Sequence, residues 1–217
     1  MADTSVTRLP AAVECDCGAE LTASEQAAAS ASHGGGALCL TCREAEAVAS
    51  ALVSRRALSV LVAGERGYAL HRRRLPGTST VIDHLFVGAS GVFVIDAAHF
   101  PDAEIVVERS GGRFSSSTEN LLVAGRRRND LVDAVREQCA RVTDGLADAR
   151  HGDVRVSPLL CFVEGNLPRR ARHRRLGDVR LVSPTNLADQ VSTDGALNGD
   201  RRFAIAMALV ALLPAAA

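Results

Sequence analysis

The chain has 217 residues, a formal net charge of +0 and 47% hydrophobic residues. This composition supports an apolar core and excludes a disordered chain, and the neutral charge gives no overall attraction to nucleic acid or to an anionic membrane. Every basic residue is an arginine, so no lysine is present to act as a catalytic base or to offset phosphate charge.

The first residues, MADTSVTRLPAAVECDCG, contain no continuous apolar core, and no segment reaches the roughly 20 apolar residues of a membrane span. We therefore expect no signal peptide, no membrane partner and a reducing, cytoplasmic location. Six cysteines in such a compartment favour metal binding or inert thiols over disulfides.

Two close cysteine pairs lie near the N-terminus, Cys15 with Cys17 and Cys39 with Cys42. Four thiolates in two pairs suit tetrahedral Zn²⁺ and leave no open coordination position, so we expect a structural zinc knuckle. His33 is an alternative ligand in place of one of the first two cysteines. Four reduced thiols without a metal are the simpler alternative.

Apolar residues recur at helical spacing from Arg43 to Val62, and Gly64 ends this predicted helix. The acids Glu44 and Glu46 complement the helix dipole at its first turn. A sharper interpretation places Glu46 beside the aspartates of the next segment as a third acid, with Glu44 and Glu65 as alternatives.

The segment from Thr80 to Phe100 is typical of a β-hairpin, because two apolar, β-branched arms flank the turn-forming sequence GASG. A symmetric turn with two or four loop residues pairs Val87 with Val92. The same register places Asp83 directly opposite Asp96.

Side chains alternate along a strand, so Asp83, Asp96 and Ala98 share one face of this hairpin. Opposed carboxylates repel by roughly 0.2 to 1 kcal/mol unless a proton, water or a cation relieves them. Mg²⁺ or Mn²⁺ would supply that relief, and a solvated pair at a sheet end is the alternative. His84 and His99 point to the opposite face, as packing or surface residues.

The rest of the central segment alternates between strand and helix patterns. Cys139 and Cys161 lie in its apolar stretches and are expected to be inert core residues. The order of elements predicts an α/β fold with a mixed sheet flanked by helices. We expect strands at 68–75, 103–109, 154–163 and 178–182, a helix at about 129–146, and a short helix opened by Ser183 and Pro184.

A polar linker at 192–200 precedes an apolar helix candidate at 202–213. Because this helix is apolar nearly all round, we expect it to be buried, either against the central sheet or in a homodimer contact. We divide the chain into a cysteine-rich zinc knuckle at 1–45, a central α/β domain at 46–191, and a linker with the apolar helix at 192–217.

Three runs carry a family resemblance: LHRRRLPG at 70–77, IDHLFVGASGVFVIDAAHF at 82–100 and LLCFVEGNLP at 159–168. Together with VREQ in the helix between them, they resemble the NERD (nuclease-related) domain, in particular actinobacterial members with a cysteine-rich N-terminus. The resemblance covers about 70–191. It implies a PD-(D/E)xK nuclease-like core, with the element order helix, three strands, helix, strand.

The resemblance also implies a metal-dependent DNA hydrolase site. Asp83 and Asp96 match the metal-binding acids, Gln138 matches a glutamine of the following helix, and the Ala97 carbonyl would complete the metal shell. Ala98 stands where the family has a lysine, either by natural divergence or by a deliberate inactivating substitution. We therefore expect weak or absent cleavage in this chain.

Two dense arginine runs lie at 126–128 and 169–175, where they suit phosphate contact or form solvated loops. Aromatic residues make up only 3% of the chain, so any DNA binding is expected to be backbone-directed and weakly sequence-specific. A non-catalytic DNA-binding or partner-binding module is the main alternative. A structural protein assembled through the zinc knuckle and the C-terminal helix is the third.

Overall fold

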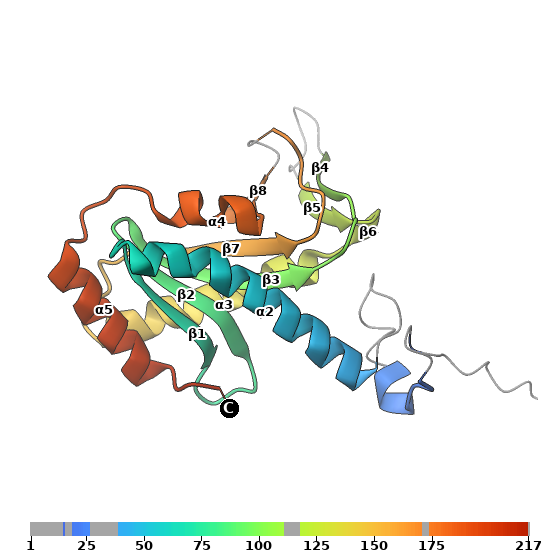
Figure 1. Ribbon diagram of the computed structural model, residues 1–217, viewed down its shortest axis with the longest axis horizontal. Helices are drawn as coiled ribbons and strands as arrows, with labels where there is room; N and C mark the ends of the chain where they lie inside the picture. Colours follow the sequence, from blue (N-terminus) through green and yellow to red (C-terminus); the bar gives the residue numbers. More distant parts are fainter. Residues whose placement is uncertain (1–14, 16–18, 27–38, 111–117, 171–173, 217) are drawn as a thin grey trace, which may run out of the picture. The chain divides into compact units, whose positions relative to one another are not determined.

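The computed structural model describes residues 15, 19–26, 39–110, 118–170 and 174–216 (Figure 1). The chain forms two compact units, Met1–Ala45 and Glu46–Ala217. The helices and strands follow one another as α2 (Leu40–Ala63), β1 (Tyr68–Arg74), β2 (Val81–Gly88), β3 (Gly91–His99), β4 (Ile105–Ser110), β5 (Thr118–Val123), β6 (Arg126–Arg127), α3 (Asn129–Asp148), β7 (Val156–Val163), β8 (Arg175–Leu176), β9 (Val179–Val182), α4 (Pro184–Val191) and α5 (Gly199–Leu212).

Six strands form a mixed sheet in the order β1-β2-β3-β7-β9-β8. The strands β1, β2 and β3 are antiparallel neighbours, whereas β3, β7 and β9 run parallel to one another. The chain returns from β3 to β7 through α3, as a parallel pair requires. The predicted α/β fold with a mixed sheet flanked by helices is confirmed.

A second, three-stranded sheet has the order β4-β5-β6. The strand expected at 103–109 corresponds to β4, but it pairs with β5 in this small sheet and not with the central hairpin. The sequence analysis missed β5, because its sequence TENLLV starts with three polar residues and has no clean alternation. Leu121 and Val123 nevertheless point into the core and are fully buried.

Different helices cover the two faces of the six-stranded sheet (Figure 1). On one face, Leu85 and Val94 share a core cluster with Val135 of α3. On the other face, Phe86 shares a second cluster with Leu187 of α4. Neighbouring side chains of the hairpin alternate between these two clusters, so each helix layer packs against every second residue of a strand.

The C-terminal helix α5 packs with one side against the central sheet, which is one of the two predicted positions, and its other side is exposed. Ile205 and Leu209 are fully buried, while Phe203 is 54% and Met207 51% exposed. The packed side faces β1, β2 and α3. A homodimer contact through its exposed side stays a prediction.

The short helix α4 begins as predicted, with Ser183 as its N-cap and Pro184 in its first turn. The Ser183 N–H donates to the Asn186 side chain at 2.8 Å, which satisfies a backbone group at the helix start. In the part of the chain that the structure describes, no helix is both long and apolar enough to cross a membrane.

Candidate functional site

The central hairpin has the register that the sequence predicts. Val87 pairs with Val92 and Gly88 with Gly91, so the turn between β2 and β3 has two residues. Gly91 has a φ of 136°, and a Cβ at this position would clash with the Arg155 carbonyl. Only glycine satisfies both demands, which fixes the turn and the register that follows from it.

Continued along the arms, this register sets Asp83 opposite Asp96, next to the pair His84–Ile95. The Ala97 N–H donates a hydrogen bond of 2.9 Å to Oδ2 of Asp83. The Asp83 carboxylate is thereby held toward β3, beside the Asp96 side chain. The hairpin alone therefore brings the two predicted acids together.

The helix α3 closes the acid pair from the side. Ala98 lies in the same core cluster as Val135 of α3, which confirms that this face of β3 looks toward α3. One turn further along α3, Gln138 is only 5% exposed and hydrogen-bonds Asp96. Its Oε1 has no hydrogen-bond partner among the described residues, so one oxygen acceptor is left unused beside the two carboxyls.

The two carboxyls of the acid pair are unfavourable when both are ionised, because they are shielded from water and lie beside each other. Burial and the charge of Asp83 raise the pKa of Asp96 to about 7, against the opposing hydrogen bond from Gln138. Burial also raises the pKa of Asp83, although the Ala97 N–H lowers it. The two carboxyls therefore share a proton near neutrality unless a cation takes its place.

Arg72 is the basic residue that acts on this pair, and the sequence analysis gave it no role. In the β1–β2 register, Arg72 falls opposite Asp83, between the pairs His71–His84 and Arg73–Ile82. It has a left-handed φ of 47°, and its charge lowers the pKa of Asp83. The β1–β2 register could not be predicted from the sequence, because a loop of six residues between the paired ends of the two strands does not fix which residues pair.

Ala98, where the family resemblance implies a lysine, presents a buried methyl group. Ala98 is 8% exposed and lies in the core cluster beside the acid pair. An alanine side chain neither accepts a proton nor carries charge. The third predicted acid, Glu46, has a side chain that lies outside the described part of the structure.

Neither nearby histidine serves the acid pair. His84 is 1% exposed on the opposite face, where its Nδ1 lies 2.9 Å from Nδ1 of His71. Burial and the charge of His71 lower the pKa of His84 to about 3, so His84 is neutral at physiological pH. His99 pairs with Glu164 at 2.9 Å. Both positions match the face predicted for them.

A separate cluster of thiols occupies the N-terminal unit. The Sγ atoms of Cys15, Cys39 and Cys42 all lie within 4.8 Å of one another. Tetrahedral Zn²⁺ with bonds of about 2.3 Å requires sulfurs about 3.8 Å apart, so the three thiols approach this geometry. The Cys39 N–H donates to Sγ of Cys15 at 3.3 Å. Cys17 and His33 lie outside the described residues.

The two thiols of the central domain that the structure describes are core residues, as predicted. Cys139 and Cys161 are buried, and burial raises their pKa values to about 11 and about 12. Such thiols stay protonated at neutral pH and are poor nucleophiles and poor metal ligands.

The two arginine runs divide into different environments. Arg128 is 8% exposed, stacks over the Phe100 ring at 5.1 Å and pairs with Asp130 at 3.0 Å. It is therefore not available for the phosphate contact that the sequence suggested. Arg126 and Arg127 are exposed on β6, and Arg169 and Arg170 are exposed after β7. Arg172 lies outside the described residues, while Arg174 and Arg175 line a cavity.

The structure is therefore a mixed α/β domain in which a central hairpin carries two opposed carboxylates and a glutamine of α3 hydrogen-bonds one of them. A family model described as NERD, the nuclease-related domain, matches residues 47–163. The chain belongs to the NERD family. No curated protein and no solved structure gave a significant match.

Proposed function

We propose that Asp83 and Asp96 hold one Mg²⁺ or Mn²⁺ ion, with the Ala97 carbonyl as a further oxygen ligand. The observation that supports this most is the half-buried carboxyl pair, in which the pKa of Asp96 is raised to about 7. Hard divalent cations prefer carboxylate, carbonyl and amide oxygens. The unpartnered Oε1 of Gln138 adds one such oxygen beside the pair.

The ancestral chemistry would be hydrolysis of a DNA phosphodiester. When bound, the metal would offset charge on the scissile phosphate and lower the pKa of water. The protein would contribute position: Ala97 N–H fixes Asp83, and Gln138 fixes Asp96. Membership in the NERD family supports this nuclease-related chemistry at the level of the class.

The missing lysine would limit this chemistry. At Ala98, no group orients or deprotonates water, and no arginine can take over as a base because guanidinium stays protonated. The neutral His84 and the paired His99 lie on the other face. We therefore propose that the chain cleaves DNA weakly or not at all while still binding the metal.

Cleavage of plasmid and linear DNA with Mg²⁺ or Mn²⁺ tests this proposal. We expect Ala98→Lys to cleave faster than the wild-type chain, and Ala98→Lys with Asp83→Ala to lose that gain. Ala98→Leu controls for the added bulk and should not cleave. A folded Ala98→Lys variant that cleaves with neither metal would refute the nuclease proposal.

A non-catalytic module that binds the DNA backbone is the second candidate, and the alanine at position 98 favours it. Exposed Arg126, Arg127, Arg169 and Arg170 would supply the phosphate contacts. This candidate predicts salt-dependent duplex binding that Asp83→Ala leaves unchanged, together with no gain of cleavage in Ala98→Lys.

We also propose that the N-terminal unit binds structural Zn²⁺ through Cys15, Cys39 and Cys42, with Cys17 as the fourth ligand. The three clustered sulfurs support this. A reducing cytoplasm would keep these thiols available to the metal.

A further inference from the structure

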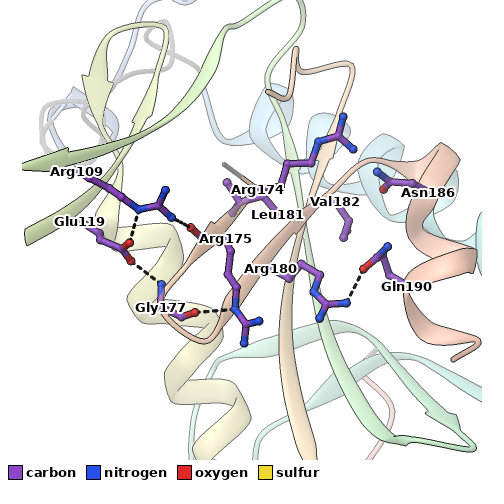
Figure 2. Close-up of a pocket in the computed structure, with 10 residues that line it drawn as sticks. All are labelled: Arg109, Glu119, Arg174, Arg175, Gly177, Arg180, Leu181, Val182, Asn186 and Gln190. Carbon is purple, nitrogen blue, oxygen red and sulfur yellow. Dashed lines mark hydrogen bonds and ion pairs between the residues drawn. The ribbon is translucent and has the colours of Figure 1, made fainter. Parts of the chain in front are cut away.

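A basic hollow lies toward the β9–β8 end of the six-stranded sheet. A cavity of about 580 Å³ opens beside β8, β9 and α4 (Figure 2). A smaller hollow of about 120 Å³ shares Arg175, Arg180 and Gln190 with it and adds Arg155. We call the two together the basic groove, and its arginines are Arg109, Arg155, Arg174, Arg175 and Arg180.

Two of these arginines face each other directly. Arg175 and Arg180 are register partners across the antiparallel β8–β9 pair. Figure 2 shows the Arg180 side chain reaching toward Gln190 and the Arg175 side chain turned toward Gly177. Like charges directly opposite across a strand pair destabilise it. The β8–β9 hairpin therefore carries a repulsion between two positive charges, whereas the Asp83–Asp96 pair carries one between two negative charges.

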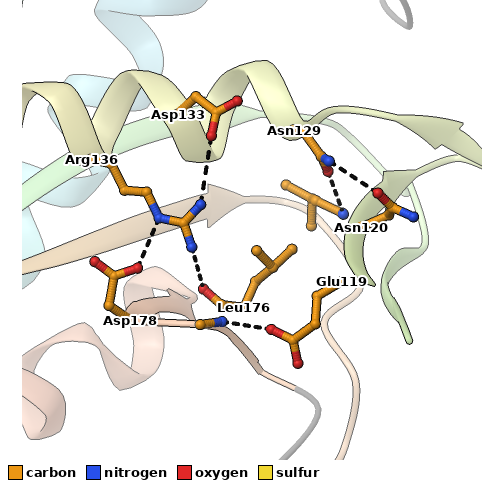
Figure 3. A network of polar contacts seen from close by, with 9 residues as sticks. Glu119, Asn120, Asn129, Asp133, Arg136, Leu176 and Asp178 are labelled. Atoms are coloured by element: carbon orange, nitrogen blue, oxygen red, sulfur yellow. Dashed lines mark hydrogen bonds and ion pairs between the residues drawn. The ribbon is translucent and has the colours of Figure 1, made fainter. Parts of the chain in front are cut away.

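The two carboxylates that line the groove pair with arginines other than Arg175 and Arg180, and Figure 3 shows the contact of Asp178 with Arg136. Asp178 pairs with Arg136, at 2.8 Å from its Nε. Glu119 accepts from Nε of Arg109 at 2.6 Å and from the Gly177 N–H at 2.7 Å. Neither acid is left to neutralise the opposed arginines.

The arginines of the pair bind only neutral acceptors. Arg180 donates to the Gln190 side chain, and Arg175 donates to the Gly177 carbonyl. Among the residues that the structure describes, no carboxylate forms an ion pair with Arg155, Arg175 or Arg180. Burial and the charges of Arg175 and Arg155 lower the pKa of Arg180. A bound anion would remove this cost.

The groove and the acid pair lie on opposite faces of the sheet. Arg180 is in register with Leu159, and Leu159 is in register with Ile95, whose side chain belongs to the cluster under α4. Asp96 is the next residue along β3 and so points to the other face. Two strand spacings also separate β3 from β9, which amounts to about 10 Å. One phosphate group cannot contact both sites.

We infer that the basic groove binds a compact anion with two or more adjacent phosphate groups, such as tripolyphosphate or a nucleoside triphosphate. Guanidinium groups bind phosphate oxygens through paired hydrogen bonds, and Arg155, Arg175 and Arg180, which line the smaller hollow together, match several adjacent phosphates. The arginines line a hollow, which favours a compact anion over a duplex. Of the lining residues, Phe93 alone is aromatic, so recognition would depend on the phosphates and little on a base.

Calorimetric titration of the full chain with tripolyphosphate, in low salt with EDTA, tests this inference. We expect binding that Arg175→Gln and Arg180→Gln each weaken by about tenfold or more, because each removes a bidentate phosphate contact. Arg141→Gln removes the same charge from an exposed site on α3, outside the groove, and should change the affinity by less than about twofold. Asp96→Asn should bind as the wild type does, which separates the groove from the proposed metal site.

A thermal unfolding midpoint for each variant checks that it is folded. Absence of tripolyphosphate binding at millimolar concentration would overturn the inference, as would equal weakening by Arg141→Gln. ATP as a second titrant shows whether a nucleoside changes the affinity. A short DNA duplex that binds tighter than either, and loses this affinity in Arg180→Gln, would overturn it in favour of a nucleic-acid surface.

Discussion

Replacing Asp96 with asparagine tests the electrostatics of the acid pair without any assumption about activity. Asparagine keeps the shape of the side chain but cannot ionise. Because burial and Asp83 raise the pKa of Asp96 to about 7, the ionised form destabilises the metal-free fold. We expect Asp96→Asn to be more stable than the wild type at pH 8 in EDTA.

The size of this gain follows from the pKa shift. A rise from 3.8 to about 7 is about three pKa units, and each unit corresponds to about 1.4 kcal/mol, giving an upper limit of about 4 kcal/mol. In the wild type, the stability linked to protonated Asp96 is fully present below pH 3.8. It is lost as the pH rises through the folded-state pKa of about 7, so the wild type is weakest relative to the variant at high pH. The asparagine also accepts a weaker hydrogen bond from Gln138 than a carboxylate does, so we expect a net gain of roughly 1 to 3 kcal/mol.

Urea unfolding at pH 8 and at pH 5, both in EDTA, measures the effect. The advantage of the variant should shrink by about 2 to 3 kcal/mol at pH 5, because wild-type Asp96 is then protonated in the folded protein. The exposed Glu137, next to Gln138 on α3, gives the matched control Glu137→Gln, which should show no such change. A variant less stable than the wild type at pH 8, or a gain that does not depend on pH, would refute the reasoning.

Three further predictions concern other parts of the chain. Because the pKa of His84 is lowered from 6.5 to about 3, the wild type loses stability as the pH falls below 6.5. The free energy of unfolding of His84→Leu, measured in urea relative to the wild type, should therefore rise by about 2 kcal/mol from pH 7.5 to pH 5. The same difference at both pH values would contradict a buried, neutral His84. Gly91→Ala should destabilise the fold by about 2 kcal/mol or more in the same assay, because alanine is strained at a φ of 136° and would meet the Arg155 carbonyl; a neutral effect would contradict the turn geometry. Fresh reduced protein should contain one zinc per chain by metal analysis and lose it in Cys42→Ser, with buried Cys139→Ser as the control; a wild-type chain without zinc would exclude the knuckle.

The hairpin and its acid pair were predictable because local rules fix them. GASG forms a two-residue turn, alternation assigns faces, and both follow from residues close in sequence. Gln138 came from the family resemblance, and the structure places it on Asp96. Helical periodicity alone gives its face of α3 but not which strand that face meets.

The basic groove was not predictable, because it depends on pairings between separate elements. The repulsion between Arg175 and Arg180 exists only in the β8–β9 register, and the role of Arg155 requires β7 and β9 to be neighbours. The same limit hid Arg72 opposite Asp83. The sequence of α5 likewise predicted burial against the sheet but not that only one side would be covered, because the available partner surface decides how much of an apolar helix is buried.

Calorimetric titration with Mn²⁺ at pH 8 tests the central claim most directly. We predict one Mn²⁺ site in the wild-type chain, its loss in both Asp83→Asn and Asp96→Asn, and unchanged binding in Glu137→Gln. Equal Mn²⁺ binding by the wild type and both aspartate variants would contradict a metal site between the two strands.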